Sequence, residues 1–597
     1  MTTLPSSARK QLENTVRKAR SVADCGARDV IARLGIAAAV APPHLSEAQK
    51  ELRRRLRAHA RSLGDRREAD GAMETRHLAE AAAYEHWHRM LFGRFLVERN
   101  LLIHPKHGVP IARGELKELA EEEGFADEWA LVERIAAPNL PGIFKPNDPL
   151  LALEIDPHFQ ARLRMLVTAL PEEIFAADDS LGWTYQFWRA DEKKRVNEAQ
   201  GKIGADELPA VTQLFTEPYM VKFLLHNTLG AWWAGKILVR RPDLAREAPD
   251  ESALRAACAL PGIDWEYLRF VHEDEYRESF TDDTEPAAPF PSPSGRGQGE
   301  GASHTNKSGH KGNGPWRPAA GTFPGWPKTS AEITYLDPCC GSGHFLIEAF
   351  AILAALRHAE EGLSPAEAAC AVLRDNLHGL EIDGRCVQIA TFGVALAAWH
   401  LAGGQITLPV PHIAWVGAPP PLPKSEFIAL ANGDAELQRG LAALHDLFQQ
   451  APLLGSLIEL AGGDLVDPTR IARLDQSIKA LVEKMRHAEP ERAEGALAAR
   501  GMADAAAILA RRFTLLATNP PFLGARDMES TLNQHLNTHF PAGKGDLATA
   551  MLLRMLRLNV EAGLTAAVLP QNWLFLESYR TLRNEILQQI AVRSVAY

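Results

Sequence analysis

Two hydrophobic patterns divide this sequence into a helical part and an alternating part. Up to about residue 200, apolar residues recur at helical spacing, most clearly in 47–67 and 75–100. From Ile333 onward, short apolar runs alternate with longer helical stretches. The expected strands are 333–336, 377–382, 412–417, 513–518 and 565–569, and the expected helices include 345–361, 365–376 and 547–560. This alternation predicts the α/β fold class, with a mostly parallel sheet preceded by an all-helical N-terminal domain.

Changes in composition predict the domain boundaries. We expect a helical N-terminal domain at 1–205 and an α/β domain at 206–597. Within the second domain, 285–328 is rich in Gly, Ser and Pro and cannot bury enough apolar surface to order itself, which predicts a flexible insertion. A proline-rich start followed by helical segments predicts a mainly helical insertion at 418–510.

The first candidate motif is Asp337-Pro-Cys-Cys-Gly-Ser-Gly343, which follows an expected strand. Asp337 falls at the carboxyl end of that strand, where open α/β sheets bind ligands. Gly341 and Gly343 allow close backbone approach, and the next helix directs its first N–H groups into the site. An acid beside such amides suits a ligand with both an ammonium and a carboxylate, such as the methionyl part of S-adenosylmethionine. Leu346 stands where a dinucleotide fingerprint requires glycine, and the sequence has no phosphate-binding G-x-x-x-x-G-K-[ST] loop.

Glu381 ends the next expected strand. A carboxylate at that position can accept hydrogen bonds from both hydroxyls of a ribose, as an acid does in dinucleotide sites. The alternative interpretation is an ordinary surface acid. Because Glu381 follows an apolar strand, the ribose-binding interpretation is favoured.

The second candidate motif is Asn519-Pro-Pro-Phe522, after another expected strand. Pro520 and Pro521 stiffen the turn, and the side-chain carbonyl of Asn519 and the backbone carbonyl of Pro520 can accept hydrogen bonds from one exocyclic amino group. This orients the nitrogen lone pair toward an incoming methyl group, and Phe522 offers a stacking face worth roughly 1–3 kcal/mol. An adenine in duplex DNA would have to be flipped out to reach it. The alternative is a simple turn.

These motifs resemble the amino-methyltransferase superfamily, specifically its N6-adenine DNA methyltransferases, and their order resembles the gamma group. The resemblance implies a Rossmann-like methyltransferase sheet in 206–597. Residues 213–218, Gln-Leu-Phe-Thr-Glu-Pro, are similar to the segment that covers the cofactor in that group. This similarity implies that Phe215, Thr216 and Pro218 line the cofactor pocket.

The wider pattern resembles the large adenine methyltransferase of BREX phage-defence systems. The similar segments are 180–188, 212–218, 337–346, 378–383, 454–458 and 571–575. The implied catalytic residues are Asn519, Pro520, Pro521 and Phe522. The implied S-adenosylmethionine ligands are Phe215, Thr216, Pro218, Asp337, Pro338, Gly341, Gly343, Phe345, Glu381 and Asp383. The implied partner is double-stranded DNA with a flipped-out adenine; other defence-system subunits are candidate partners, and neither a metal nor a membrane is expected.

Two departures from the family pattern stand out. Members usually carry a polar or acidic residue after the third strand to meet the cofactor's adenine, but 412–417 runs into prolines, which leaves Asp434 and Asp464 as candidates. Members also continue into a target-recognition region, whereas this sequence stops at Tyr597. We therefore expect a chain without the C-terminal recognition region, either a fragment or half of a split enzyme.

Composition limits the partners and the compartment. The net charge is −10, so a nucleic acid would have to meet a local basic surface. Arg53–Arg67 is one candidate, with a solvated helix face as the alternative. Asp178 and the run Glu192-Lys-Lys194 faintly resemble a nuclease pattern. Six cysteines without a CxxC pair argue for a reducing cytosol and against structural zinc, and the polar N-terminus lacks a signal peptide, so we expect a soluble cytoplasmic protein.

The leading functional hypothesis is a site-specific DNA methyltransferase that transfers a methyl group from S-adenosylmethionine to the N6 amino group of adenine, in a restriction-modification or BREX-type phage-defence system. The alternatives are a non-catalytic cofactor-binding scaffold or truncated half-enzyme, and a methyltransferase of glutamine N5 or of an RNA base, since Asn-Pro-Pro-aromatic also serves those substrates.

Overall fold

The structure is a computed structural model that describes residues 3–199, 201–212, 216–273, 314–460 and 467–596. The chain forms two compact units. The first comprises Met1–Val221 and Gly325–Ile590, and the second comprises Lys222–Pro324 and Ala591–Tyr597. Each unit is described by itself. The predicted boundary between 205 and 206 stays a prediction.

The described residues up to 199 form helices, with isolated bridges at Arg67–Met73 and Ile103–Pro110 but no strand. The expected helix 47–67 ends earlier because Gly64 adopts a left-handed conformation with φ 108°. The helices are α1 Ser6–Arg33, α2 Glu47–Leu63, α3 Arg76–Glu98, α4 Leu116–Glu122, α5 Glu128–Ala136, α6 Pro141–Phe144, α7 Pro157–Thr168, α8 Glu172–Ala176 and α9 Ser180–Ala199.

The basic run on α2 is divided between the interior and the surface. Arg53 is buried and its Nε donates to the carbonyl of Gly35 over 3.0 Å. Arg57 donates to the carbonyls of Ala38 (2.8 Å) and Gly71 (2.6 Å). These two arginines therefore hold neighbouring loops, and only the other arginines of the run remain as candidates for a basic surface.

The acids of the suggested nuclease pattern take part in ion pairs between helical segments. Asp178 pairs with Arg99 over 3.4 Å, and the buried Glu192 of α9 pairs with Arg20 of α1 over 3.4 Å. These contacts give both acids a structural role. The aromatic segment from Ser180 forms the start of α9, as expected of a core helix.

A five-stranded sheet lies at the centre of the first unit, in the order β5-β4-β3-β6-β7, and all its neighbouring strands are parallel. The strands are β3 Tyr335–Asp337, β4 Leu377–Glu381, β5 His412–Trp415, β6 Phe513–Thr518 and β7 Asn559–Ala567. The predicted parallel sheet is thus confirmed. The predicted start of β7 at 565 is wrong, because its first residues are exposed at the sheet edge and carry no apolar pattern.

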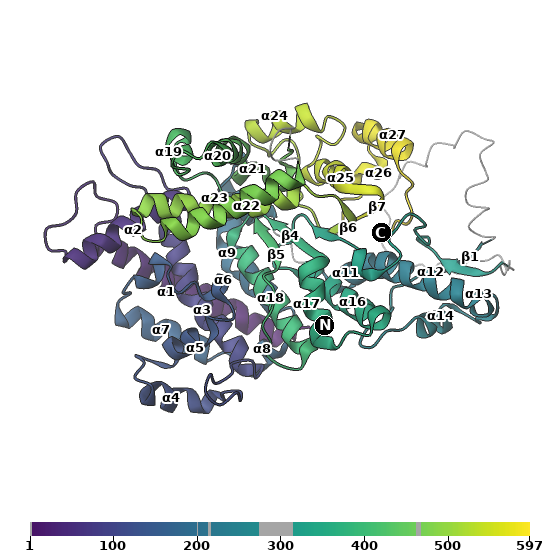
Figure 1. Ribbon diagram of the computed structural model, residues 1–597, viewed down its shortest axis with the longest axis horizontal. Helices are drawn as coiled ribbons and strands as arrows, with labels where there is room; N and C mark the ends of the chain where they lie inside the picture. The colour runs from purple at the N-terminus through teal and green to yellow at the C-terminus, as the bar shows by residue number, and fades with distance from the viewer. Residues whose placement is uncertain (1–2, 200, 213–215, 274–313, 461–466, 597) are drawn as a thin grey trace. The chain divides into compact units, whose positions relative to one another are not determined.

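Helices cover both faces of this sheet (Figure 1). α16 (His344–Glu361) lies on the face of Gly379, where a Cβ would be 2.9 Å from Leu346 Cδ1. The adjacent Leu380 points to the opposite face and joins a core formed with the helical insertion. α17 (Pro365–Asp375) and α18 (Gly384–Ala402) accompany α16.

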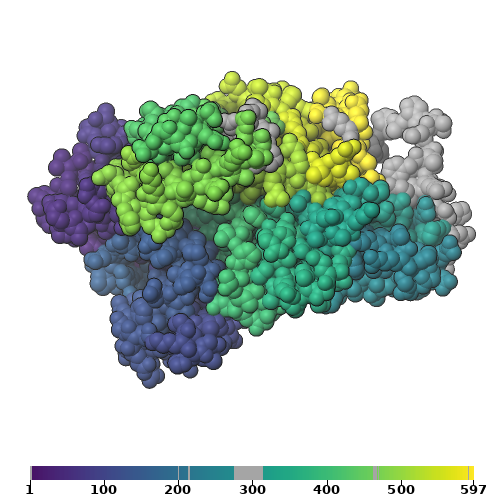
Figure 2. Space-filling model, viewed as in Figure 1, coloured from purple at the N-terminus to yellow at the C-terminus, as the bar shows by residue number. Residues whose placement is uncertain are grey.

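The predicted helical insertion at 418–510 contains helices throughout its described part. Figure 2 shows its light green surface beside the purple N-terminal helices, where Glu494 of α23 contacts His59 Nδ1 and Ser62 Oγ of α2, both over 3.2 Å. The insertion therefore packs against both the sheet and the N-terminal helices. Its elements are α19 Lys424–Ala429, α20 Ala435–Phe448, α21 Ala451–Leu454, the 3-10 turn η5 Gly455–Leu457, α22 Pro468–Met485 and α23 Pro490–Leu509.

The first unit is completed by short helices before and after the sheet. They are α10 Leu208–Thr212, α24 Ser530–His539, α25 Leu547–Leu558, α26 Asn572–Phe575 and α27 Arg580–Gln589. In the described part of the chain, α18 alone is long and apolar enough by composition to cross a membrane. Because 61% of its apolar window is buried and it packs on the sheet, α18 has the properties of a core helix.

The second unit is small and centres on tryptophans. The indole nitrogens of Trp233 and Trp265 both donate to the carbonyl of Cys258, over 2.9 and 2.7 Å. Of the stretch 285–328 that we predicted to be flexible, residues 285–313 lie outside the described residues, while 316–318 form a strand. The elements are the shared helix α11 Pro218–Leu225, the π-helical turn η3 His226–Gly230, α12 Ala231–Arg240, α13 Pro242–Glu247, α14 Glu251–Ala257 and the antiparallel pair β1 Phe270–His272 and β2 Trp316–Pro318.

Candidate functional site

The order of the strands creates a ligand-binding position between β3 and β6. From β3 the chain proceeds outward through β4 to β5, and it then returns to the other side of β3 with β6 and β7. Such a reversal leaves a crevice at the carboxyl ends of the two central strands. Asp337 ends β3 and Asn519 directly follows β6, so both motifs border this crevice.

The loop after β3 has the geometry of a ligand cradle. Gly343 has φ 92° and a Cβ there would lie 2.9 Å from Ala390 Cα, so only glycine fits between this loop and α18. Gly341 has φ 51°, and open space lies where its Cβ would stand. Asp337 is buried and accepts from the Cys339 N–H over 3.1 Å. Burial raises the pKa of the Asp337 carboxyl to about 7.

Glu381 ties the end of β4 to this loop. Its Oε2 accepts from the Gly341 N–H over 2.8 Å, and its Oε1 accepts from the Asp383 N–H over 3.0 Å. Burial raises its pKa to about 7, against the effect of these backbone N–H groups. Two further acceptor positions of the carboxylate remain for a ligand.

The carboxylate of Asp383, two residues after Glu381, contacts other residues of the protein. It caps α18 by accepting from the Arg385 N–H over 3.0 Å, pairs with the Arg385 guanidinium over 2.9 Å, and accepts from the Tyr185 hydroxyl of α9. Burial alone would raise its pKa, but the charges of Arg385 and Arg189 hold it below its ordinary value. Asp383 therefore connects α9, the end of β4 and α18.

Asn519 presents a free acceptor beside the loop after β3, residues 338–343, which is named the donor loop. Its Nδ2 donates to Thr216 Oγ1 over 3.0 Å, which fixes the orientation of the amide. Its Oδ1 is buried and has no hydrogen-bond partner within the described part of the chain. A buried acceptor without a partner is unfavourable, so a ligand N–H directed at this oxygen would be bound strongly.

A single cavity joins the two motifs. It encloses about 660 Å³ when the space of its open mouth is included. Its lining includes residues of both motifs and of four further segments: Leu208, Thr212, Pro338, Cys339, Gly341, Glu381, Ile382, Leu453, Leu454, Gly455, Ser456, Leu457, Asn519, Pro521, Leu547 and Met551.

The lining of this cavity does not include the predicted site residues Pro520, Phe522, Phe345 and Pro218. Pro520 is buried in the turn, Phe522 follows with a half-buried side chain, and Phe345 is buried at the start of α16. Pro218 is the first residue of α11. Phe215 lies outside the described residues, so its role stays a prediction.

Asp434, one of the two candidates for the contact with the cofactor's adenine, does not belong to the cavity lining. Asp434 is exposed and caps α20 by accepting from the N–H groups of Glu436 and Leu437, both over 3.0 Å. Asp464 lies outside the described residues. Sequence reasoning missed instead the wall formed by 453–457, although part of this segment carried the family resemblance.

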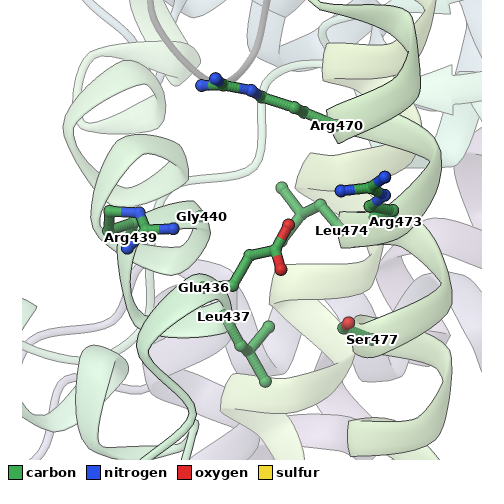
Figure 3. A pocket seen from close by; sticks show the side chains of 8 residues that line it. All are labelled: Glu436, Leu437, Arg439, Gly440, Arg470, Arg473, Leu474 and Ser477. Carbon is green, nitrogen blue, oxygen red and sulfur yellow. The ribbon is translucent and has the colours of Figure 1, made fainter.

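A second hollow opens between α20 and α22, away from the motifs (Figure 3). Arginines from both helices surround Glu436 there, and none of the motif residues belongs to its lining. Within the described residues, no group of three or more His, Cys, Asp or Glu side chains is placed to hold a metal ion. The cavity at the strand ends is therefore the candidate site. The lining of the second hollow consists of Glu436, Leu437, Arg439, Gly440, Arg470, Arg473, Leu474 and Ser477.

Two family models match the part of the chain that contains this site. The model of the Eco57I restriction-modification methylase matches residues 375–597, and that of the MmeI DNA-methyltransferase domain matches residues 327–409. Together they span the donor loop, Glu381 and Asn519. The part of the chain that contains the site is thus similar to methyltransferase domains of the restriction-modification type.

Over a longer stretch the chain is similar to adenine-specific methyltransferases. It is 26% identical over 453 residues to the adenine-specific methyltransferase PglX of Lacticaseibacillus casei (strain Zhang), covering 75% of this chain and 33% of that protein. It is also 26% identical over 463 residues to the adenine-specific methyltransferase BrxX of Escherichia coli O9:H4 (strain HS), covering 73% and 32%. The predicted resemblance to BREX adenine methyltransferases is confirmed, and the chain spans about a third of the length of these relatives.

A cryo-EM structure of a DrdV–DNA complex aligns with 98% of this chain and 37% of that chain. The TM-score is 0.39 and the sequence identity 11%. This similarity is too low to support an inference about fold or ligand.

Proposed function

We propose that the chain is a DNA methyltransferase that transfers a methyl group from S-adenosylmethionine to the N6 amino group of adenine, in a cytoplasmic restriction-modification or BREX-type defence system. The observation that carries this proposal is the buried, unpartnered Oδ1 of Asn519 in the same cavity as Gly341 and Glu381. Double-stranded DNA with a flipped-out adenine is the proposed substrate, and other defence-system subunits are the proposed partners.

The residues present fit S-adenosylmethionine, which supplies an electrophilic methyl group on a sulfonium when it is bound. Gly341 leaves space and backbone beside Asp337 for the amino-acid end, and Glu381 has free acceptor positions for ribose hydroxyls. We propose that Pro338, Gly343 and Phe345 shape the part of the site that holds S-adenosylmethionine. Thr216 and Pro218, with Phe215, are proposed to cover it.

Asn519 and its neighbours are proposed to hold the acceptor. The Asn519 Oδ1 and the Pro520 carbonyl accept the two N–H groups of the target amine, so the nitrogen lone pair points out of that plane. Pro521 keeps the turn stiff, and Phe522 stacks on the base. Catalysis then depends on orientation, because the amine loses its proton only after the C–N bond has formed.

The helices of residues 1–205 are proposed to form a supporting domain for this site. Tyr185 on α9 donates to Asp383 at the start of α18. Gly182, one turn earlier on α9, has no room for a Cβ, which would lie 2.4 Å from His344 Cε1 beside the donor loop. Both contacts link α9 to segments that carry the proposed donor-binding residues.

Transfer of a tritiated methyl group tests this function. The chain is incubated with labelled S-adenosylmethionine and either mixed-sequence duplex DNA or a dG-dC duplex without adenine. We expect label only in the DNA that contains adenine. Binding of S-adenosylmethionine without transfer to any DNA would instead support the scaffold, and transfer to RNA or protein would support the other alternative.

The affinity for S-adenosylmethionine is expected to increase as the pH rises from 6 to 8. Asp337 and Glu381 have pKa values of about 7, and a ligand with an ammonium and ribose hydroxyls favours their ionised forms. Because the ionised fraction of such a carboxyl rises about tenfold per pH unit below its pKa, we expect up to about a tenfold gain per carboxyl. Calorimetry in buffers of different ionisation enthalpy measures both the affinity and the released proton. An affinity that is constant over this range would contradict the assignment.

Thr216→Val is expected to lower kcat about tenfold and to leave donor affinity unchanged. The valine keeps the shape but removes the oxygen that accepts from Asn519 Nδ2, which costs about 1–1.5 kcal/mol of orientation. Thr216→Ser keeps the hydroxyl and serves as the control. Steady-state kinetics with varied donor distinguishes the roles, since a higher donor KM with unchanged kcat would mean that Thr216 acts as a cofactor ligand instead.

A further inference from the structure

The segment Leu454–Ile458 belongs to the helical insertion, yet it reaches the end of β3. Its Ser456 Oγ donates to the Pro338 carbonyl over 2.5 Å, across 118 residues of sequence. Pro338 lies in the donor loop, between Asp337 and the glycines. This hydrogen bond therefore fastens the segment directly to the proposed donor-binding site.

The segment faces the side of the cavity that continues from Glu381. Gly455 has φ 49°, and a Cβ there would lie 3.2 Å from Ile382 Cδ1, so the backbone lies directly over Ile382. Ile382 follows the acid that we assign to the ribose. A base attached to that ribose would enter the part of the cavity that is lined by Ile382, by Leu453 and by the two leucines of the segment, Leu454 and Leu457.

Arg554 of α25 hydrogen-bonds to the backbone of this segment. The side chain is 4% exposed; its Nε donates to the Ser456 carbonyl over 3.1 Å and an Nη donates to the Ile458 carbonyl over 2.7 Å. Glu459 lies 3.7 Å from the guanidinium. A buried guanidinium is unfavourable unless it is hydrogen-bonded, and both of these bonds go to the backbone of one segment.

We propose that Leu454–Ile458 forms the wall that encloses the purine of the methyl donor, and that Arg554 is the positioning residue that holds this wall. The inference rests on the proposed function, because it assumes that the cavity binds S-adenosylmethionine. It supplies the purine contact that Asp434 does not make. The contact is apolar and depends on shape, with Ile382 on one side of the base and leucines on the other.

Calorimetry with S-adenosylmethionine tests the role of Arg554. We expect Arg554→Met to weaken binding by tenfold or more, Arg554→Lys to weaken it less because lysine can reach one of the two carbonyls, and Ser456→Ala to weaken it about threefold. The matched control is Arg557→Met on the same helix. The native Arg557 side chain pairs with Glu459, but it donates to the His539 carbonyl rather than to the segment. We expect its affinity to stay within twofold of wild type. At saturating donor, kcat of Arg554→Lys should equal that of wild type.

Saturation-transfer NMR with S-adenosylhomocysteine tests the purine contact without turnover. When protein methyl groups are irradiated, the purine protons H2 and H8 should receive more saturation than the methionyl protons, and Leu457→Ala should reduce this difference.

Ser456→Ala should retain the thermal stability of wild type, so its affinity remains informative if Arg554→Met does not fold. Wild-type affinity in both Ser456→Ala and Arg554→Lys would overturn the inference while leaving the proposed function intact. Equal losses in the Arg554 and Arg557 variants would overturn it too, and a wild-type chain that does not bind the donor would overturn both.

Discussion

Asn519→Ala is expected to lower the rate of methyl transfer by at least about a hundredfold while leaving the affinity for S-adenosylmethionine within a few-fold of wild type. The substitution removes the buried Oδ1 that we propose to orient the target amine, and the loss of one such orienting group costs about two to three orders of magnitude in kcat. Single-turnover kinetics with duplex DNA measures the transfer step, and calorimetry measures donor binding.

The matched control is Asn537→Ala, which makes the same substitution on the exposed face of α24, away from the cavity. Its transfer rate should equal that of wild type. A transfer rate of Asn519→Ala within threefold of wild type would contradict the assigned mechanism. A loss of donor binding in this variant would mean that Asn519 contributes to the donor half of the site.

Asp383→Asn is expected to lower the free energy of unfolding by about 3 kcal/mol, because it leaves the half-buried Arg385 charge without its buried partner and removes the carboxylate that accepts from Tyr185. Urea unfolding at pH 7 measures the change. Glu381→Gln, two residues earlier, should instead act mainly on donor affinity, since burial already disfavours the charge of Glu381 in the free protein.

The pH dependence of unfolding gives a second check on Asp383. Its pKa is held below the ordinary value, so the stabilisation is fully present above the pKa of an unfolded aspartate and is lost as the pH falls through the folded pKa. The difference in stability between wild type and Asp383→Asn should therefore be constant near neutral pH and decrease in acid. If Asp383→Asn unfolds like wild type but loses donor affinity, Asp383 is a cofactor ligand, as the family resemblance implies.

The sequence was sufficient to predict the sheet and the position of the two motifs on it. Apolar runs that end in Asp337, Glu381 and Asn519 are local signals, and parallel strands bring their carboxyl ends to one edge. The edge strand β7 was placed only in part, because the three residues after Asn559 are exposed and the start of the strand lacks an apolar pattern.

The remaining features of the site depend on contacts between distant residues. Asn519 and Thr216 are 303 residues apart, and Ser456 and Pro338 are 118 residues apart, so no local pattern indicates either hydrogen bond. Asp383 carried a local signal that was open to another interpretation: an aspartate directly before a helix is a preferred N-cap. Its pairing with Tyr185 becomes visible only when α9 is packed against α18.

We propose that one cavity brings a methyl donor to the N6 amino group of adenine, and the identity of the methylated atom is therefore the measurement of choice. Duplex DNA is incubated with the chain and S-adenosylmethionine that carries a trideuterated methyl group, then digested to nucleosides for mass spectrometry. We expect N6-(trideuteromethyl)deoxyadenosine with the wild-type chain and a loss of about a hundredfold or more with Asn519→Ala. A label found on cytosine, or equal amounts of labelled deoxyadenosine from both proteins, would contradict it.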